Sequence, residues 1–185
     1  MLAAREDLVN QIGEIAKKNG TTLFALTNMA LENLVDLDML EAQFGEAVNA
    51  HKILKTAREA GFVLAPESLL YDTAERIYCT DEKWACKRWT EAGEWYGNYH
   101  RTKKPETRLN DVVNDFSLFF WNVREFNIIQ KNGNMLLQCV VPRLPENYSL
   151  LFGMFLRGAL SSLGYECVEE NFVKGIFSLT FKPRC

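Results

Sequence analysis

The sequence predicts an α+β protein, in which a helical N-terminal region precedes a domain of antiparallel strands packed against apolar helices. Three observations predict this class. Apolar residues recur at helical spacing through residues 2–60. The pair Asn132-Gly133 lies between two apolar runs, which is a strong hairpin signal. Two further apolar runs, 165–168 and 175–181, indicate a second pair of strands.

The N-terminal region is expected to contain three helices. The first spans 2–18, the second repeats apolar residues between 23 and 37, and the third runs from 39 to 60. Glycine follows the first and third helices, as is usual at helix C-termini. We therefore expect one domain at 1–60 and a second at 61–185.

The second domain should follow the order helix, helix, strand, strand, helix, strand, strand from residue 80 onward. Its helices are predicted at 80–101, 107–122 and 147–163. The last of these is apolar nearly all round, and Arg157 is the only strongly polar residue between positions 150 and 160. A helix of this kind is normally buried. Its apolar run is far shorter than the roughly 20 residues of a membrane span, so no span is expected.

Composition favours a folded cytoplasmic protein. The chain has 185 residues, 48% of them hydrophobic, and a net charge of −3, a balance that does not indicate nucleic acid as a partner. Its N-terminus lacks the apolar core of a signal peptide. Five cysteines at irregular spacing argue against a disulfide framework, and we predict no metal site. The chain contains none of the motifs GxGxxG, GxxxxGK[ST] or GxSxG, so neither a cofactor nor catalysis is expected.

Large apolar residues are unusually frequent in the helices of the second domain. Two interpretations remain open: a filled core, or a core with space for an apolar ligand. Glycines in the closing helix remove side chains, and Cys139 lies in an apolar strand, where a core role is more typical than a nucleophile. The candidate ligand-pocket residues are Trp95, Tyr99, Phe116, Phe119, Phe120, Cys139, Phe152, Gly153, Phe155 and Gly158.

Residues 80–184 resemble the 4-vinyl-reductase (hydrocarbon-binding) domain family. The segment RWTEAGEWYGNYH is similar to that family's small-residue helix, and LLFGMFLRGALSSLGYECVEENFVKGIFSLTF to its closing helix–strand–strand unit. The family shares its fold with Bet-type vesicle-tethering subunits, and many members are fused to DNA-binding modules in archaeal regulators. The resemblance implies a small hydrophobic ligand. Family cysteines have no clear counterparts here, so no cysteine cluster is carried over.

Residues 5–35 resemble the two helices of a ribbon–helix–helix module. In that family the turn before the second helix contacts a DNA phosphate, which implies phosphate contacts from Lys17, Lys18, Thr21 and Thr22. The DNA-reading strand would precede Arg5, where only four residues stand. Three interpretations follow: the pair serves dimerisation, the chain start is truncated, or the segment is an ordinary helical hairpin.

These observations lead to one preferred functional hypothesis and one alternative. The protein is expected to be a non-catalytic cytoplasmic homodimer that binds a small hydrophobic molecule and needs no cofactor. The alternative is a ligand-responsive transcription regulator that binds DNA through its N-terminal helices, although the missing strand and the acidic charge balance oppose it.

Overall fold

The computed structural model describes residues 4–39, 44–103, 112, 116, 125–131 and 133–184. It confirms the α+β class. The chain divides into two compact units, Met1–Leu54 and Lys55–Cys185, and the domain boundary expected after residue 60 stays a prediction. The described elements are α1 (Glu6–Lys18), α2 (Leu23–Met39), α3 (Phe44–Glu59), α4 (Glu67–Thr80), α5 (Glu82–Lys103), β1 (Glu125–Lys131), β2 (Asn134–Val140), α7 (Glu146–Ser162), β3 (Tyr165–Val173) and β4 (Ile176–Pro183).

The N-terminal unit is helical, as expected, but it buries little. Of α1 and α2, only Ala16 is a buried residue. The turn between the helices closes when the amide of Thr21 donates to the carbonyl of Ala16 at 3.0 Å. Thr22 then begins α2, because its hydroxyl accepts a hydrogen bond from the amide of Ala25 at 3.1 Å.

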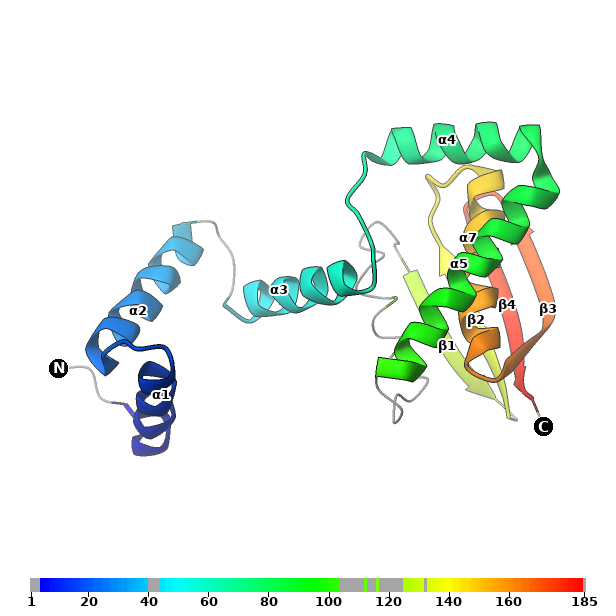
Figure 1. Ribbon diagram of the computed structural model, residues 1–185. Helices are drawn as coiled ribbons and strands as arrows, with labels where there is room; N and C mark the ends of the chain where they lie inside the picture. Colours follow the sequence, from blue (N-terminus) through cyan, green and yellow to red (C-terminus); the bar gives the residue numbers. More distant parts are fainter. Residues whose placement is uncertain are drawn as a thin grey trace. The chain divides into compact units, whose positions relative to one another are not determined.

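In the C-terminal unit, α7 lies between α5 and the sheet (Figure 1). It contacts α5 along one side and strands β3 and β4 along the other, while α4 packs against both helices. This position explains why the sequence of α7 is apolar nearly all round: a helix covered on two sides has little surface left for water. Half-exposed Arg157 marks the side of α7 that reaches solvent.

The sheet is antiparallel throughout, with strand order β1-β2-β4-β3. Its core face is set by alternation, since the side chains of a strand point to opposite faces in turn. The buried residues of the two central strands are Met135, Leu137 and Cys139 in β2 and Phe177, Leu179 and Phe181 in β4. Gly133, at φ 80°, and Gly175, at φ 74°, take the left-handed conformation in the turns of the two hairpins.

The structure refines three of the expected elements. The sequence of residues 62–66 allows a short strand or an extended entry; in the structure these residues form no strand and lead into α4. The sequence of residues 67–78 favours a helix only slightly over other structures, and the structure has the helix Glu67–Thr80 there. The helix expected at 107–122 lies outside the described residues except for Val112 and Phe116, both of which are buried.

Candidate functional site

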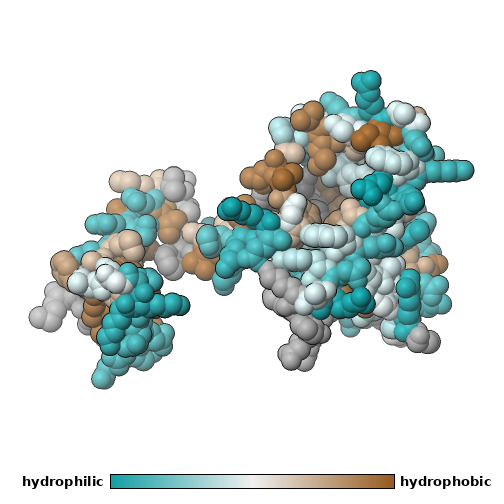
Figure 2. Space-filling model, in the orientation of Figure 1, coloured by the Kyte–Doolittle hydropathy of each residue, from teal (hydrophilic) through white to brown (hydrophobic). Residues whose placement is uncertain are grey.

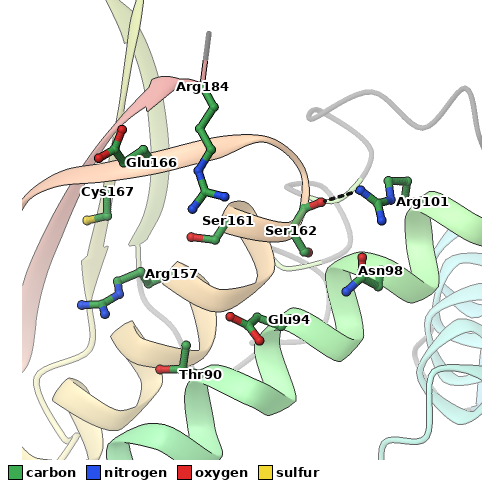
Figure 3. A pocket seen from close by; sticks show the side chains of 10 residues that line it. All are labelled: Thr90, Glu94, Asn98, Arg101, Arg157, Ser161, Ser162, Glu166, Cys167 and Arg184. Atoms are coloured by element: carbon green, nitrogen blue, oxygen red, sulfur yellow. Dashed lines mark hydrogen bonds between the residues drawn. The ribbon is translucent and has the colours of Figure 1, made fainter.

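A polar cleft follows the seam where α5 meets α7 and β3, and all of it belongs to the C-terminal unit. Its volume is about 660 Å³. A smaller hollow of about 420 Å³ adjoins it and shares Thr90, Glu94 and Arg157. The cleft is lined by Thr90, Glu94, Asn98, Arg101, Arg157, Ser161, Ser162, Glu166, Cys167 and Arg184 (Figure 3).

Helix α5 supplies one wall of the cleft. Thr90, Glu94, Asn98 and Arg101 are spaced four, four and three residues apart, so they share one face of the helix. The start of α5 is fixed by Asp81, whose carboxylate accepts a hydrogen bond from the amide of Trp84 at 2.9 Å. This cap sets the point at which the polar face of α5 begins.

The last turns of α7 form the floor. Arg157, Ser161 and Ser162 line the cleft there, and the Ser162 hydroxyl donates to the carbonyl of Ala159 at 2.8 Å. From the facing wall, Nη1 of Arg101 donates to the carbonyl of Ser162 at 3.4 Å (Figure 3). A cation at this position stabilises the partial negative charge at the C-terminus of α7. Arg101 therefore already has a structural role, because its side chain stabilises the C-terminus of α7.

The third wall comes from β3 and the residues after β4. It contributes Glu166, Cys167 and Arg184. Although Arg184 follows the last strand, its amide donates to the carbonyl of Gly164 at 2.8 Å, which holds the backbone in place. Figure 3 shows its guanidinium group directed down toward Ser161, whereas that of Arg157 is directed away from Arg184 and lies below Cys167.

The positive charges of the cleft are only partly neutralised. Nη1 of Arg157 lies 3.4 Å from Oε2 of Glu170, a half-exposed pair of the kind that contributes about 0–1 kcal/mol. Glu166 pairs instead with Lys182, outside the cleft, at 3.5 Å. Within the described part of the chain, no ion pair involves Arg101 or Arg184. Three arginines therefore line the cleft against two glutamates.

The thiol in the cleft is not activated. Burial, and then the nearby carboxylate of Glu170, raise the pKa of Cys167 above its ordinary value. A raised pKa keeps the sulfur protonated near neutral pH, and a protonated thiol is a poor nucleophile. Its hydrogen-bond partner is the carbonyl of Glu169, at 3.5 Å. The arrangement is suited to binding through charge and hydrogen bonds.

The predicted ligand-pocket residues lie mainly in the core, away from this cleft. Phe116, Cys139, Phe152, Gly153 and Gly158 are buried. The rings pack on one another, as in the Phe116–Phe155 pair at 6.2 Å between centroids and the Phe152–Phe177 pair at 5.6 Å. Phe119 and Phe120 lie outside the described residues. Trp95 is 54% exposed and stacks on Tyr99.

Both glycines of the closing helix contact protein. An added Cβ at Gly153 would meet the ring of Phe172 in β3, and one at Gly158 would meet the backbone of Thr90 in α5. The five-residue spacing of the glycines turns them about 140° apart around the helix, so each faces a different neighbour. The prediction that both glycines line a ligand pocket has no support in these contacts.

The residues predicted to contact DNA phosphate lie in the N-terminal unit. Nζ of Lys17 pairs with Glu14 at 2.9 Å, and Thr22 caps α2, as described above. Lys18 is exposed and Thr21 is half-buried. These contacts give Lys17 and Thr22 roles within their own helices.

Sequence reasoning missed the residues of the cleft, apart from noting Arg157 as an isolated charge. Two signals were present. A single arginine in an otherwise buried helix marks the line where that helix reaches water. The polar residues of α5 at 90, 94, 98 and 101 share one face. No local pattern in the sequence shows that the polar face of α5 and Arg157 of α7 lie side by side in the fold.

The comparisons with known proteins do not find the two families that the sequence resembles. No family model matches the chain, and no curated protein matches it. Solved structures that resemble it include one described as an oxygen-binding H-NOX domain related to soluble guanylate cyclases, at 12% identity and a TM-score of 0.38, covering 74% of this chain and 86% of that one. A second, from work on heme redox potential and porphyrin distortion, has 13% identity and a TM-score of 0.37, covering 71% and 88%.

These findings correct the assignments to the 4-vinyl-reductase family and the ribbon–helix–helix module, because the neighbours found are H-NOX domains. The functions drawn from those resemblances, a hydrophobic small-molecule binder or a DNA-binding regulator, are wrong and are not retained. The physical reason lies in the glycines that carried the resemblance. They permit close helix packing, which any two touching helices can require. At such low identities and TM-scores, the H-NOX likeness itself carries no assignment.

The residues of this chain do not fit a heme at the cleft. Heme iron in proteins is held by His, Cys, Met or Tyr side chains in a largely apolar pocket. The cleft is polar, and its one sulfur ligand, Cys167, has a raised pKa. His100 is buried but lies against the rings of Tyr96 and Tyr99, at 4.5 and 5.4 Å between centroids, and lines neither hollow.

Within the described ranges, no helix is both long and apolar enough to cross a bilayer.

Proposed function

We propose that the C-terminal unit binds a small anionic molecule, bearing a carboxylate or phosphate group, in the arginine-lined cleft. One observation carries this proposal: Arg157 and Arg184 come from separate elements, α7 and the segment after β4, and both line the same polar cleft (Figure 3). Two positive charges that line one cleft attract an anion more strongly than either does alone. The hydroxyl group of Ser161 provides a further donor.

The chemistry of arginine supports an oxyanion as the ligand. A guanidinium group presents parallel N–H donors that match the two oxygens of a carboxylate or phosphate, and such charge-assisted hydrogen bonds are stronger than neutral ones. A volume of about 660 Å³ falls in the range of small-molecule sites. We therefore expect a metabolite-sized ligand rather than a macromolecule.

The two glutamates narrow the ligand class further. Glu94 and Glu166 line the cleft on the walls beside the arginines. They disfavour a ligand with several negative charges spread over its length, and they accept hydrogen bonds from a ligand that carries an amine or hydroxyl group. We propose a ligand with one anionic end and one donor end.

We propose binding without catalysis at this site. The support is chemical. The one thiol of the cleft has a raised pKa, which opposes nucleophilic attack. Arg101 is committed to the C-terminus of α7. The remaining lining groups are donors and acceptors suited to holding a ligand.

Titration calorimetry on the full chain at low ionic strength tests the proposal, with phosphoethanolamine, which has one anionic end and one amine end, and inorganic phosphate as probes and glucose as the neutral comparison. We expect at least one anion to bind and glucose not to bind. Arg157→Gln and Arg184→Gln should each weaken binding by about tenfold, since a charge-assisted hydrogen bond contributes about 1.5–3 kcal/mol. Arg143→Gln removes an exposed arginine that lines neither hollow, and should bind as the wild type does.

Equal weakening by all three arginine variants would mean that only the overall charge of the protein matters, and would overturn the site. Lack of binding by phosphoethanolamine and by phosphate alike would overturn the proposed function. A fall in affinity with added salt is expected in the wild type, because the contacts are ionic and partly exposed.

We also propose that the protein is a cytoplasmic homodimer. Support for the dimer comes from the N-terminal unit, whose helices leave large apolar side chains at the surface (Figure 2). Support for the compartment comes from Cys79, Cys86, Cys139 and Cys167, which are free thiols. Free thiols are usual where the environment is reducing.

A further inference from the structure

We propose that the ligand of the polar cleft carries a protonated amine, which binds between Thr90 and Glu94, and that its chain continues past the nitrogen into the smaller hollow. This inference rests on the anion binding proposed above, and it assigns the donor end of the ligand to two residues. Thr90 and Glu94 are called here the amine subsite. The ligand class is a phosphate or carboxylate that bears an N-alkyl amine.

The amine subsite lies on one face of α5. Thr90 and Glu94 are four residues apart, so their Cβ atoms lie about 5–6 Å apart on successive turns. Both residues line the cleft, and both line the smaller hollow. Figure 3 shows them across the seam from Arg157 and Ser161 of α7. A nitrogen atom held between the two turns is therefore within reach of both side chains.

The hydroxyl group of Thr90 is set to accept a hydrogen bond from a ligand. Its one hydrogen is donated to the carbonyl of Cys86, one turn earlier in α5, at 2.9 Å. The lone pairs of the hydroxyl oxygen remain available. An unprotonated phosphate or carboxylate group offers only acceptors and gains nothing from Thr90, whereas an N–H group can donate to it.

Glu94 supplies a carboxylate that no cation of the protein neutralises. Within the described ranges no ion pair involves Glu94. Glu166, the other glutamate of the cleft, lies 3.5 Å from Nζ of Lys182. A ligand hydroxyl would leave the charge of Glu94 unbalanced, whereas a protonated amine balances it. The free charge therefore favours an amine at Glu94 over a hydroxyl group, and Glu94 over Glu166 as its partner.

The cations of the smaller hollow do not oppose an amine strongly. Lys87 pairs with Glu91 at 3.7 Å. Arg157 pairs with Glu170 at 3.4 Å. Each positive charge is thus partly balanced by a neighbouring carboxylate, whereas that of Glu94 stands alone. A ligand with an anion on the arginine side and an amine at Glu94 meets an opposite charge at both ends.

The smaller hollow gives the ligand room beyond the amine. It continues along α5 and α7 as far as Cys86 and Met154. Burial raises the pKa of Cys86, so this thiol is uncharged near neutral pH. The thioether of Met154 packs well on apolar groups. An alkyl group on the nitrogen suits this lining better than a further charge does.

Calorimetry on the full chain compares phosphoethanolamine with propyl phosphate, which has a methyl group in place of the amine. At mildly alkaline pH both phosphates are dianions and the amine is protonated. We expect phosphoethanolamine to bind about fivefold more tightly, the upper end for an ion pair with a partly exposed carboxylate. The N-propyl derivative of phosphoethanolamine should bind about threefold more tightly again, because its alkyl group leaves water in the smaller hollow.

Glutamate variants identify the partner of the amine. Glu94→Gln should abolish the fivefold preference for phosphoethanolamine over propyl phosphate, since the charge that attracts the amine is gone. Glu166→Gln should keep the preference, because that carboxylate already faces Lys182. Glu169→Gln removes an exposed charge of β3 that lines neither hollow, and measures the effect of net charge alone.

Threonine variants test the hydrogen bond. Thr90→Val keeps the shape of the side chain but removes the acceptor, and should reduce the preference about threefold, as for a typical hydrogen bond. Thr90→Ser keeps the hydroxyl group and should retain the preference. Phosphocholine has the same charges but no N–H group, so its affinity should not respond to Thr90→Val. Thermal melts check that the variants remain folded.

The outcomes separate the two proposals. Failure of every phosphate to bind overturns the anion site and this inference together. Equal binding of propyl phosphate and phosphoethanolamine leaves the anion site standing and overturns the amine subsite. A preference that survives Glu94→Gln, or one that Glu166→Gln abolishes, overturns the assignment of the amine to Glu94. Weaker binding of the N-propyl derivative than of phosphoethanolamine overturns the extension into the smaller hollow.

Discussion

Gly158 of α7 lies directly against the backbone of Thr90 in α5: a Cβ at Gly158 would overlap with the carbonyl oxygen of Thr90. From the other side, Gly93 and Gly97 of α5 meet the backbone of α7 in the same way. The two helices therefore touch backbone to backbone. This close approach brings the polar face of α5 beside Arg157 and so creates the cleft.

Gly158→Ala should destabilise the protein, because backbone atoms on the facing helix cannot rotate away from the added methyl group. Overpacking of this kind costs about 1–3 kcal/mol and outweighs the gain of about 1 kcal/mol in helix propensity. Urea and thermal melts measure the loss. The matched control is Gly13→Ala in α1, where an added Cβ meets no atom within 4 Å. That variant should be neutral or slightly stabilising, and equal losses in both would refute the contact.

Gly153→Ala should cost less than Gly158→Ala, although both glycines are buried in the same helix. The atom that a new Cβ would meet at Gly153 belongs to the ring of Phe172, on the edge strand β3. A half-buried ring can turn aside, whereas a helix backbone cannot. We expect a loss below about 1 kcal/mol. Phe172→Leu should reduce that loss when combined with Gly153→Ala, which a double-mutant cycle measures.

Local patterns in the sequence predicted most of the elements correctly but little of their arrangement. The signal at Asn132-Gly133 predicted the β1–β2 hairpin, since turn residues act within a few positions. The pairing of Cys139 in β2 with Phe177 in β4 joins segments far apart in the chain. Nothing in the sequence of either strand indicates which strand it will pair with. The sheet order β1-β2-β4-β3 was therefore not predictable from periodicity.

The candidate site was harder still, because it depends on three segments meeting. The polar face of α5 was readable from its spacing, but its proximity to Arg157 required the glycine contacts of two helices. Arg184 reaches the cleft because its amide is held by Gly164, a backbone contact that no side-chain pattern reveals. The same glycines misled the sequence interpretation, since they were read as family features and as openings for a ligand.

Glu94→Gln should strengthen anion binding in the cleft. Glu94 lines the cleft together with Arg157, so its negative charge opposes an anionic ligand. Removing one partly exposed charge should improve affinity about threefold at low ionic strength, and less as salt increases. Calorimetry with inorganic phosphate measures the change. Glu91→Gln is the comparison, since Glu91 lies on α5 but does not line the main cleft. An unchanged or weaker affinity in Glu94→Gln would argue that the ligand's anionic end lies elsewhere.

Cys139 should make the protein less stable at high pH. Burial raises the pKa of this thiol from 9.0 to about 12. Below pH 9.0 the thiol is protonated in both states, so its contribution to stability is fully present. Between pH 9.0 and about 12 the unfolded chain loses the proton while the folded one keeps it, so the free energy of unfolding falls as pH rises.

Urea unfolding at several pH values between about 8 and about 11 measures this slope. Cys139→Ala should flatten it, even though the variant starts from lower stability because of the cavity it leaves. Tyr148 acts in the same direction, since burial raises its pKa to about 12, so Tyr148→Phe should flatten the slope further. Cys79→Ala removes an exposed thiol and should flatten the slope less than Cys139→Ala does. A slope unchanged in Cys139→Ala would show that the thiol ionises as readily in the folded protein as in the unfolded chain, which its complete burial in β2 opposes.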